Sequence, residues 1–523
     1  MESITAVEDK LIDGLSFKLG AGASYITNRR SVSFQPQGSN VYEATGGTRL
    51  LRIALNGNGW LDPDTLRVSY DMVNKETGGI KNLRMLGGPY SIFRRGRLLC
   101  AGTVIEDIDN FNRVSHMLQL LKSKHSRVND QAEGFGSEWS EHDYLQIGIT
   151  PGFFAAGEVD TTVTGNKVPA LFATRGMDSL TFEGIKPGES QKVLFKPCFG
   201  MFNQSKFIPI DYANLILELE LVSDPNDPIL YSGLYGNTTL DVADAGIIRP
   251  ATTFTETNCT NQWRIQNVEV KCDIITIDDQ LNASYSQHLL SGKSLSISYS
   301  TMITQVQTIT GQSKPSVNIS RALTRLKAAF VTFEKHNIVG PYKVGAKGYR
   351  SFWSPMAIEN GYHSVDPSGV HFRHSSEGEF SFQIQNGSKV YPEYPMKGHA
   401  EAYSHLRKVM GHKSSDVHSF DISPRQYRDN RFILAVDFEK VTGGEAGWSG
   451  ENTRSGSLLS IKFEYNNSGN VKDGATTPLD VRIGPNNAQL VSRSGARLAD
   501  QMMVTLISDN ILEINANGVS VFD

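Results

Sequence analysis

Residues 92–99 read IFRRGRLL, and a glycine turn separates them from a helical pattern over residues 106–121. Residues 382–390 read FQIQNGSKV, and a proline-rich turn separates them from a second helical pattern over 401–410. A strand, a turn and a helix therefore follow one another in the same order twice, more than half the chain apart. The rest of the chain shows mainly strand and turn patterns. This repeat predicts two similar β domains in tandem, which is typical of subunits of assemblies rather than of enzymes.

The composition is that of a folded, turn-rich chain. Of its 523 residues, 39% are apolar, 20% are charged and 48 are glycines, so the chain is long enough for a large core and for two to four domains. The formal net charge is −4, which excludes a global positive field for holding nucleic acid. In residues 1–30, four acidic side chains balance four basic ones, so we expect no strongly basic genome-condensing arm.

The cysteines indicate folding in a reducing compartment. Cys100, Cys198, Cys259 and Cys272 lie far apart, form no CxxC pair, and are too few for a disulfide framework in a chain of this length. The N-terminus lacks a basic start followed by an apolar run, and no apolar run approaches the length of a membrane span. We therefore predict neither a signal peptide nor a transmembrane segment.

Two segments show strand alternation most clearly. Residues 215–221 read LILELEL, so that leucine fills every odd position while two glutamates share the other face. This predicts a strand with one buried and one solvated face. Residues 458–465 repeat the alternation, with Leu459, Ile461 and Phe463 on one side. Because turn residues recur roughly every 8–12 positions, the pattern favours β sandwiches or barrels.

The chain divides into three predicted parts. Residues 1–38 lack sustained periodicity, and we interpret them as an arm lying over the body. The first β domain is predicted over 39–290 and the second over 291–523. Four helices are expected from apolar residues recurring every three to four positions, over 106–121, 278–290, 321–327 and 401–410.

Two short segments resemble motifs for chemistry but lack their essential parts. Residues 291–294 read SGKS, as at the end of a phosphate-binding loop, yet the earlier glycine that the loop needs is replaced by Gln287. Residues 447–450 read GWSG and lack the spacing of a nucleophile elbow. We interpret both segments as ordinary turns.

Histidines concentrate in one region. Seven of the twelve lie between His363 and His418, which raises a metal hypothesis. A strand would place His371 and His374 on opposite faces, and no carboxylate is spaced to complete a set of three ligands. Surface or interface histidines are the preferred interpretation, and the sequence predicts no catalytic, cofactor-binding or metal-ligating residues.

The arginines near the first repeat leave two alternatives open. Arg94, Arg95 and Arg97 are suited to contacting nucleic acid or a carboxylate of a neighbouring subunit, or they form a solvated strand edge. No such cluster recurs in the second half. There, basic side chains line the helix and its exit, which is compatible with a phosphate-facing or subunit-facing surface: His405, Arg407, Lys408, His412 and Lys413.

Several segments in one order make the chain similar to the major capsid proteins of Polinton-like viruses, adintoviruses and virophages, within the wider adenovirus-hexon-like lineage. The likeness runs from about residue 24 to 523. The segments that carry it are SYITNRR at 24–30, GWLDPDTL at 59–66, QNGSKVYP at 385–392, EAY at 401–403 with HLR at 405–407, and ILEI at 511–514 followed by Gly518 and Val519.

The resemblance implies an all-β chain with two tandem jelly rolls, each an eight-stranded antiparallel sandwich, and a few short helices in loops. It implies a homotrimer of six-cornered outline that tiles an icosahedral shell around a double-stranded DNA genome. The implied partners are further copies of the chain, penton proteins and minor or cement proteins, with no cofactor and no strong direct binding of nucleic acid. Contact with an internal membrane is left open. The implied location is the virion, after folding in the host cytoplasm or nucleus.

Two other classes of function are alternatives to a capsid protein. A receptor- or carbohydrate-binding spike built of jelly rolls would gather aromatic residues on loop tips, whereas the five tryptophans are dispersed along the chain. A cupin-like metalloenzyme would need a histidine-rich pair of strands facing inward. We expect a structural protein and not an enzyme.

Overall fold

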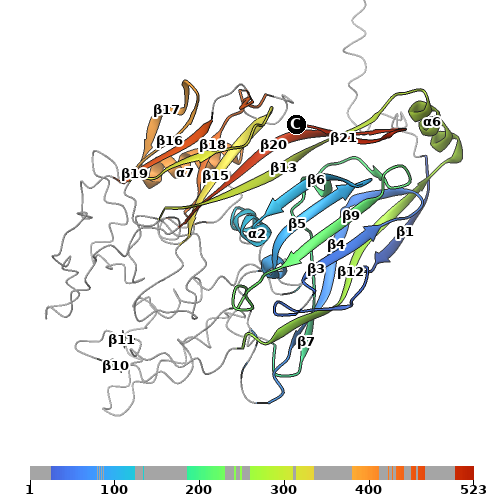
Figure 1. Cartoon of the computed structure of the whole chain (residues 1–523), viewed down its shortest axis with the longest axis horizontal. Coiled ribbons are helices and arrows are strands. Elements are labelled where there is room, and N and C mark those ends of the chain that lie inside the picture. The colour runs from blue at the N-terminus through green and yellow to red at the C-terminus, as the bar shows by residue number, and fades with distance from the viewer. Residues whose placement is uncertain are drawn as a thin grey trace, which may run out of the picture.

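A computed structural model shows two β sandwiches joined along one edge (Figure 1). The structure describes residues 25–46, 48–78, 88–123, 185–229, 260–309, 314–334, 380–411, 432–440, 449–454, 458–465 and 501–523, with the short stretches 81, 83, 85, 134, 241–242, 248–249, 422 and 427. Within these residues no helix is long and apolar enough to cross a membrane.

The first sandwich is formed by two antiparallel sheets. One has the order β1-β12-β4-β7, with the short strands β2 and β8 paired to β12 and β4, and the other has the order β3-β9-β5-β6. The bounds are β1 Ile26–Phe34, β2 Val41–Tyr42, β3 Leu50–Leu55, β4 Trp60–Asn74, β5 Phe93–Cys100, β6 Thr103–Asp109, β7 Ser190–Phe195, β8 Ile208–Pro209, β9 Leu215–Leu221 and β12 Trp263–Ile277. The 3-10 helices η2 (Pro89–Ile92) and η6 (Gly200–Phe202) lie between strands, and β10 (Asp241–Val242) pairs with β11 (Ile248–Arg249).

The second sandwich has sheets of the order β13-β20-β15-β18, with β21 paired to β20, and β14-β19-β16-β17. Its bounds are β13 Leu295–Thr308, β14 Ser316–Ile319, β15 Leu326–Glu334, β16 Phe380–Asn386, β17 Lys389–Lys397, β18 Leu434–Asp437, β19 Leu459–Tyr465, β20 Gln501–Asn515 and β21 Gly518–Phe522. The helices are α2 (Phe111–Leu120), α6 (Asp279–Leu290) and α7 (His399–Val409).

The two sandwiches have the same topology. If the eight main strands of each are numbered along the chain, both have one sheet of order 1-8-3-6 and another of order 2-7-4-5. This is the arrangement of a jelly roll. A helix follows the fifth strand in both, α2 after β6 and α7 after β17. The repeated strand, turn and helix of the sequence are thus a repeated hairpin and helix.

The strand predictions are confirmed, with one correction. The leucines of β9 are buried and so are Leu459, Ile461 and Phe463 of β19. The expectation that the glutamates of β9 face water is wrong for Glu218, which is only 6% exposed. Its carboxylate lies between Arg97 (2.7 Å) and Arg52 (3.6 Å) on the neighbouring strands. These two guanidinium groups compensate the charge that burial would otherwise penalise.

Two of the four helix predictions need correction. Residues 103–109 form β6, and α2 begins only at Phe111. Asn110 interrupts the pattern, because its backbone is left-handed with φ +53°, a conformation that asparagine tolerates. The buried residues of β6 and those of α2 together happen to have the spacing of a single apolar helical stripe. Residues 321–327 form no helix, since Leu326 starts β15 and pairs with Glu451. The helices expected over 278–290 and 401–410 are present as α6 and α7.

The chain has two apolar cores, one centred in each sandwich, and the first also includes residues of β13 and β20 from the second sandwich. Residues 26–34, which fall inside the predicted arm 1–38, form the edge strand β1 and pair with β12. Helix α6, which ends at Leu290, connects β12 of the first sandwich to β13 of the second. The division into 1–38, 39–290 and 291–523 itself remains a prediction.

Candidate functional site at the junction of the two sandwiches

Helix α2 contributes to both cores. Phe111 and Val114 belong to the core of the first sandwich, where the Phe111 ring lies 5.5 Å from that of Phe199. Met117, Leu120 and Leu121 belong to the core of the second sandwich. The helix therefore has apolar side chains in two directions, as expected of a helix buried between two layers. It connects the two sandwiches together with β6 and η6, which contact β13.

A nearly buried ion pair fixes α2 to the outer face of the second sandwich. Arg113 Nε lies 2.8 Å from Glu334 Oε1, and the two side chains are only 12% and 10% exposed. Phe333, the preceding residue on β15, points the other way, into the aromatic core, where its ring lies 5.2 Å from that of Phe463. Since side chains alternate along a strand, Glu334 belongs to the outer face of the sheet, and α2 covers that face.

Strand β13 fixes the other side of the junction. The Tyr299 hydroxyl donates to the carbonyl of Ile105 (2.9 Å), and the Thr304 hydroxyl donates to that of Asp109 (2.6 Å). A Cβ placed on Gly200 would lie 1.7 Å from the carbonyl oxygen of Ser300. Only glycine permits this close approach of η6 to β13.

A carboxyl group is buried behind this contact. Glu106 is 2% exposed and accepts hydrogen bonds from the backbone N–H groups of Gly200 (2.9 Å) and Met201 (2.7 Å). Burial raises the pKa of Glu106 to about 8, although the hydrogen bonds from Met201, Gly200 and Thr301 act in the opposite direction. Glu106 thus connects β6 to the first two N–H groups of η6. This connection lies where β13 of the second sandwich approaches η6.

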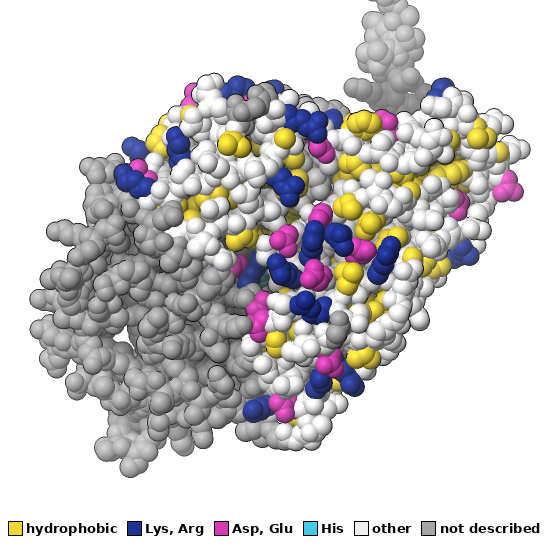
Figure 2. Space-filling view, viewed as in Figure 1, with side chains coloured by type: hydrophobic (Ala, Val, Ile, Leu, Met, Phe, Trp, Pro, Cys, Tyr) yellow, Lys and Arg dark blue, Asp and Glu magenta, His cyan; other side chains and the backbone are white. Residues whose placement is uncertain are grey.

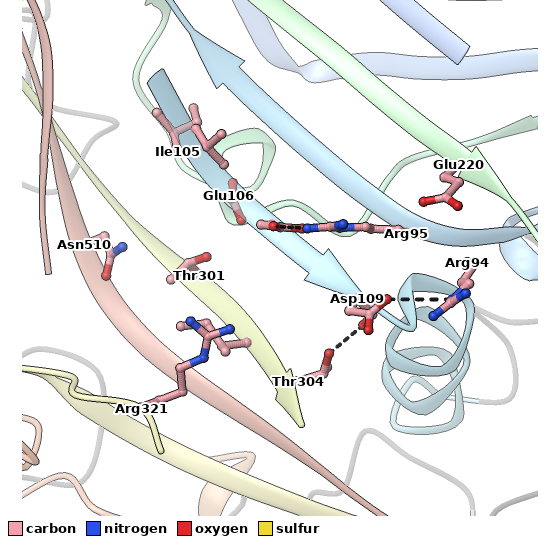
Figure 3. Close-up of a pocket in the computed structure, with 13 residues that line it drawn as sticks. Arg94, Arg95, Ile105, Glu106, Asp109, Glu220, Thr301, Thr304, Arg321 and Asn510 are labelled. Carbon is pink, nitrogen blue, oxygen red and sulfur yellow. Dashed lines mark hydrogen bonds and ion pairs between the residues drawn. The ribbon is translucent and has the colours of Figure 1, made fainter. Parts of the chain in front are cut away.

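A cleft of about 550 Å³ opens beside Glu106 between the two sandwiches. Figure 3 shows side chains from both sandwiches pointing into it, Arg95 and Asp109 from the first and Thr301 and Arg321 from the second. Arg95 binds Asp107 through two hydrogen bonds, of 2.8 and 2.6 Å. Arg94 and Arg95 are thus paired with carboxylates of their own hairpin, while the Thr304 hydroxyl of the second sandwich donates to the Asp109 carbonyl across the cleft.

The three arginines of the first repeat are ion-paired within the chain. Arg97 lies 2.7 Å from Glu218, Arg95 lies 2.6 Å from Asp107, and the more exposed Arg94 lies 3.9 Å from Asp109. Figure 2 shows the result as basic and acidic side chains interspersed over the middle of the molecule. Of the two alternatives left open by the sequence, this geometry favours the half-solvated strand surface, with its carboxylates supplied by this chain.

The segments singled out for chemistry are dispersed. His399 is buried among Phe380, Phe432 and Tyr427, and burial together with Lys408 lowers the pKa of His405. Residues 291–294 form the turn between the end of α6 and the start of β13, as predicted. Among the residues that the structure describes, no three His, Cys, Asp or Glu side chains are grouped as a metal site. The remaining members of the histidine-rich region, among them His371 and His374, lie outside the described residues, as do Gly447 and Trp448 of the GWSG segment.

The cysteines in the described part of the chain are free thiols. Burial raises the pKa of Cys100, Cys198 and Cys272 to about 12, so these thiols remain protonated at neutral pH. Cys259 lies outside the described residues.

The junction was not predicted from the sequence. Its essential residues are Glu106, Arg113, Gly200, Tyr299 and Glu334, and none of them belongs to a motif. One signal was present, because residues 111–121 carry apolar side chains in more directions than a single buried stripe needs. That excess indicates a helix covered on two sides.

Two sandwiches of identical strand order in one chain define a double jelly roll, and the predicted all-β fold class is confirmed. No family model and no curated protein matches the chain. In fold, it is similar to the solved structure of VP54 of the virus PBCV-1, with a TM-score of 0.54 and 14% identity over 97% of this chain and 99% of that one.

Two further solved structures agree. A quasi-atomic capsid structure of PBCV-1 matches with a TM-score of 0.51, 14% identity and coverage of 97% of this chain and 99% of that one. A cryo-EM structure of the Sputnik virophage matches with a TM-score of 0.50, 10% identity and coverage of 98% and 91%. The chain thus shares its fold, over nearly its whole length, with these solved structures.

Proposed function

We propose that the chain is the major capsid protein of a double-stranded DNA virus or virus-like element. In this proposal three chains form a capsomer of six-cornered outline, because each contributes two similar sandwiches, and the capsomers tile an icosahedral shell. The observation that carries the proposal is the identical strand order of the two sandwiches. The fold match to PBCV-1 VP54 over 97% of this chain supports it.

The geometry of the junction also supports a structural role. The contacts between the sandwiches are of the kind found in protein interiors, with α2 shared by two cores and the Arg113–Glu334 pair nearly buried. Such a junction holds the two sandwiches in a fixed relation. A building block that must reproduce one outline many times needs this rigidity.

The partners in this proposal are chiefly other copies of the chain. Penton proteins and minor or cement proteins complete the shell, the protein resides in the virion, and the chain folds in the reducing cytoplasm or nucleus of the host. The protein acts by assembly and carries out no catalysis.

The test is the size of the purified full-length chain. Light scattering and mass photometry should show a particle of three 57.6-kDa chains, and electron microscopy should show a six-cornered outline. A stable monomer at micromolar concentration would contradict the proposal. Metal analysis of the same sample would separate the cupin-like alternative, which requires a bound metal ion.

A further inference from the structure

The chain contains one complete contact between its sandwiches and both unmatched halves of a second. In the complete contact, α2 of the first sandwich lies on the outer face of the β13-β20-β15-β18 sheet of the second. Each sandwich has one such helix and one such sheet. Among the residues that the structure describes, no equivalent contact involves helix α7 of the second sandwich or the outer face of the β1-β12-β4-β7 sheet of the first.

The two helices use the same spacing to bind their own sandwich. In α2 the residues facing inward are Phe111, Val114 and Leu118, and in α7 they are His399, Ala402 and Leu406. This equivalence places Glu401 of α7 where α2 has Arg113, and Lys408 where α2 has Leu120.

The outward side of α7 is polar and open. Ala400, Glu401, Ser404 and Lys408 are all exposed. In α2 the positions equivalent to Glu401 and Lys408 contact the second sandwich, since Arg113 binds Glu334 and Leu120 belongs to the second core. Asn112 and His116 of α2 instead bond to Ser91 and Tyr90 of η2 in the first sandwich. The two helices thus differ in whether a neighbouring sandwich covers their outward side.

The unmatched sheet face is polar as well. The side chains that β4 and β12 direct away from the core include Arg67, Asp71, Glu269 and Lys271. The equivalent strand β15 instead carries Phe330, Thr332 and Glu334 on the face opposite to Phe333, and all three are buried. Glu334 binds Arg113 of α2. Interfaces between separately folded surfaces have a polar rim and are more polar than a contact within one folded core.

We propose that α7 of one copy of the chain lies against the outer face of the β1-β12-β4-β7 sheet of a second copy, in the way that α2 lies against the second sandwich within the chain. The inference rests on the proposed function and specifies its intersubunit surface. The contact is head-to-tail, because it joins the second sandwich of one copy to the first sandwich of the next. Together with the contact inside each chain, it places first and second sandwiches alternately around a closed ring. Both surfaces carry charges of both signs, Glu401 and Lys408 on α7 and Arg67, Asp71, Glu269 and Lys271 on the sheet, so each acidic or basic group of the helix has an opposite charge available on the sheet.

The test uses three tryptophan variants of the full-length chain. Ser404→Trp obstructs the outward side of α7, and Lys271→Trp obstructs the middle of the receiving sheet. Ser284→Trp is the matched control, because Ser284 is an exposed serine in the middle of α6, another helix of the chain. We expect the control to remain trimeric, while each of the other two variants runs as a folded monomer with an unchanged circular dichroism spectrum.

Mixing the two monomeric variants tests the head-to-tail geometry. The Ser404→Trp chain keeps an intact sheet face and the Lys271→Trp chain keeps an intact α7, so one contact can form between them. We expect a heterodimer in the mixture at tens of micromolar and monomers in each variant alone. Trimers in either variant, or a mixture that stays monomeric, would overturn the inference while leaving the proposed function intact. A wild-type chain that is itself monomeric would instead refute the proposed function.

Discussion

The hairpin β5–β6 of the first sandwich and the hairpin β16–β17 of the second occupy the same place in the same topology, yet their surroundings differ. In β6, Ile105, Glu106 and Ile108 are buried, because β13 and η6 close over them. In β17, Tyr394 is 64% exposed and most other residues are half-buried or open. Topology determined the backbone of each hairpin, whereas the neighbouring sandwich determined which side chains are buried.

Both cores contain stacked aromatic rings, but at different places in the shared topology. In the second core Phe380 and Phe463, on the paired strands β16 and β19, stack at 5.3 Å between centroids. In the first core Phe93 of β5 stacks at 5.7 Å on Phe195 of β7, in the opposite sheet. The same strand order thus accommodates two different arrangements of large side chains, as expected where overall volume and pattern determine a fold.

The largest expected effect comes from charging both cores at one equivalent position. Leu217 of β9 and Ile461 of β19 are both 0% exposed. We expect Leu217→Asp and Ile461→Asp each to abolish soluble, folded protein, because burying an unpaired charge costs several kcal/mol. Soluble yield and circular dichroism measure the outcome, and Lys462→Asp, at an exposed position of the same strand β19, is the control. Wild-type yield from one of the two core variants would show that the sandwiches are not equivalent in importance.

The next effect distinguishes the covered helix from the uncovered one. Replacing Arg113 with alanine leaves the Glu334 carboxylate nearly buried without its cation, which should destabilise the chain by about 3 kcal/mol. Lys408→Ala removes an exposed charge from the equivalent helix α7 and should change the stability of the monomeric chain by less than about 0.5 kcal/mol. Urea unfolding followed by circular dichroism measures both changes. Equal midpoints for the two variants would mean that the ion pair does not stabilise the junction.

Much of the fold was predictable because its signals are local. Strand β9 was visible in its alternating leucines and helix α6 in its apolar spacing, ended by Ser291 and Gly292. The jelly-roll topology itself came from the family resemblance and not from local patterns. Strand β6 was missed because Asn110 ends the strand without a glycine or proline to mark the break.

The junction lay beyond sequence reasoning because its partners are distant along the chain. Glu106 bonds to a backbone 94 positions away, and Tyr299 to one 194 positions away. A glutamate on an apolar segment gives no indication of which N–H groups it will reach. The arginines near Gly96 were noticed as a cluster, but the carboxylates that pair with them come from β6 and β9, and only the register of these strands reveals them.

The buried acid of the first sandwich should make its stability depend on pH. Folded Glu106 keeps its proton up to about pH 8, whereas the unfolded side chain releases it near 4.5. Between these values the unfolded state binds fewer protons, so stability falls as pH rises, by about 1.4 kcal/mol per pH unit. The contribution is complete below pH 4.5 and lost above pH 8.

Glu106→Gln isolates this contribution. Glutamine does not titrate, so the difference in unfolding free energy between the wild type and the variant should itself slope with pH across that window. Urea unfolding at several pH values between 5 and 8 measures it. The slope is the readout, because glutamine also satisfies the N–H groups of Gly200 and Met201 less well. Parallel curves would mean that Glu106 does not hold its proton in the folded state.

The smallest effects on stability are expected from the arginines near Gly96, and their size should follow how deeply the partner carboxylate is buried. Glu218, the partner of Arg97, is only 7% exposed in its side chain, whereas Asp109, the partner of Arg94, is 51% exposed. We expect Arg97→Ala to cost about 1–2 kcal/mol, because a buried carboxylate loses its shorter ion pair and keeps only the longer contact with Arg52. Arg94→Ala should cost less than about 0.5 kcal/mol, because water solvates both partners.

Raising the salt concentration should reduce any effect of Arg94 and leave most of that of Arg97, since salt screens exposed charges more than buried ones. An equal cost for the two substitutions would mean that the contact between Arg97 and Glu218, which the register of β5 against β9 brings about, does not stabilise the fold more than an exposed ion pair does.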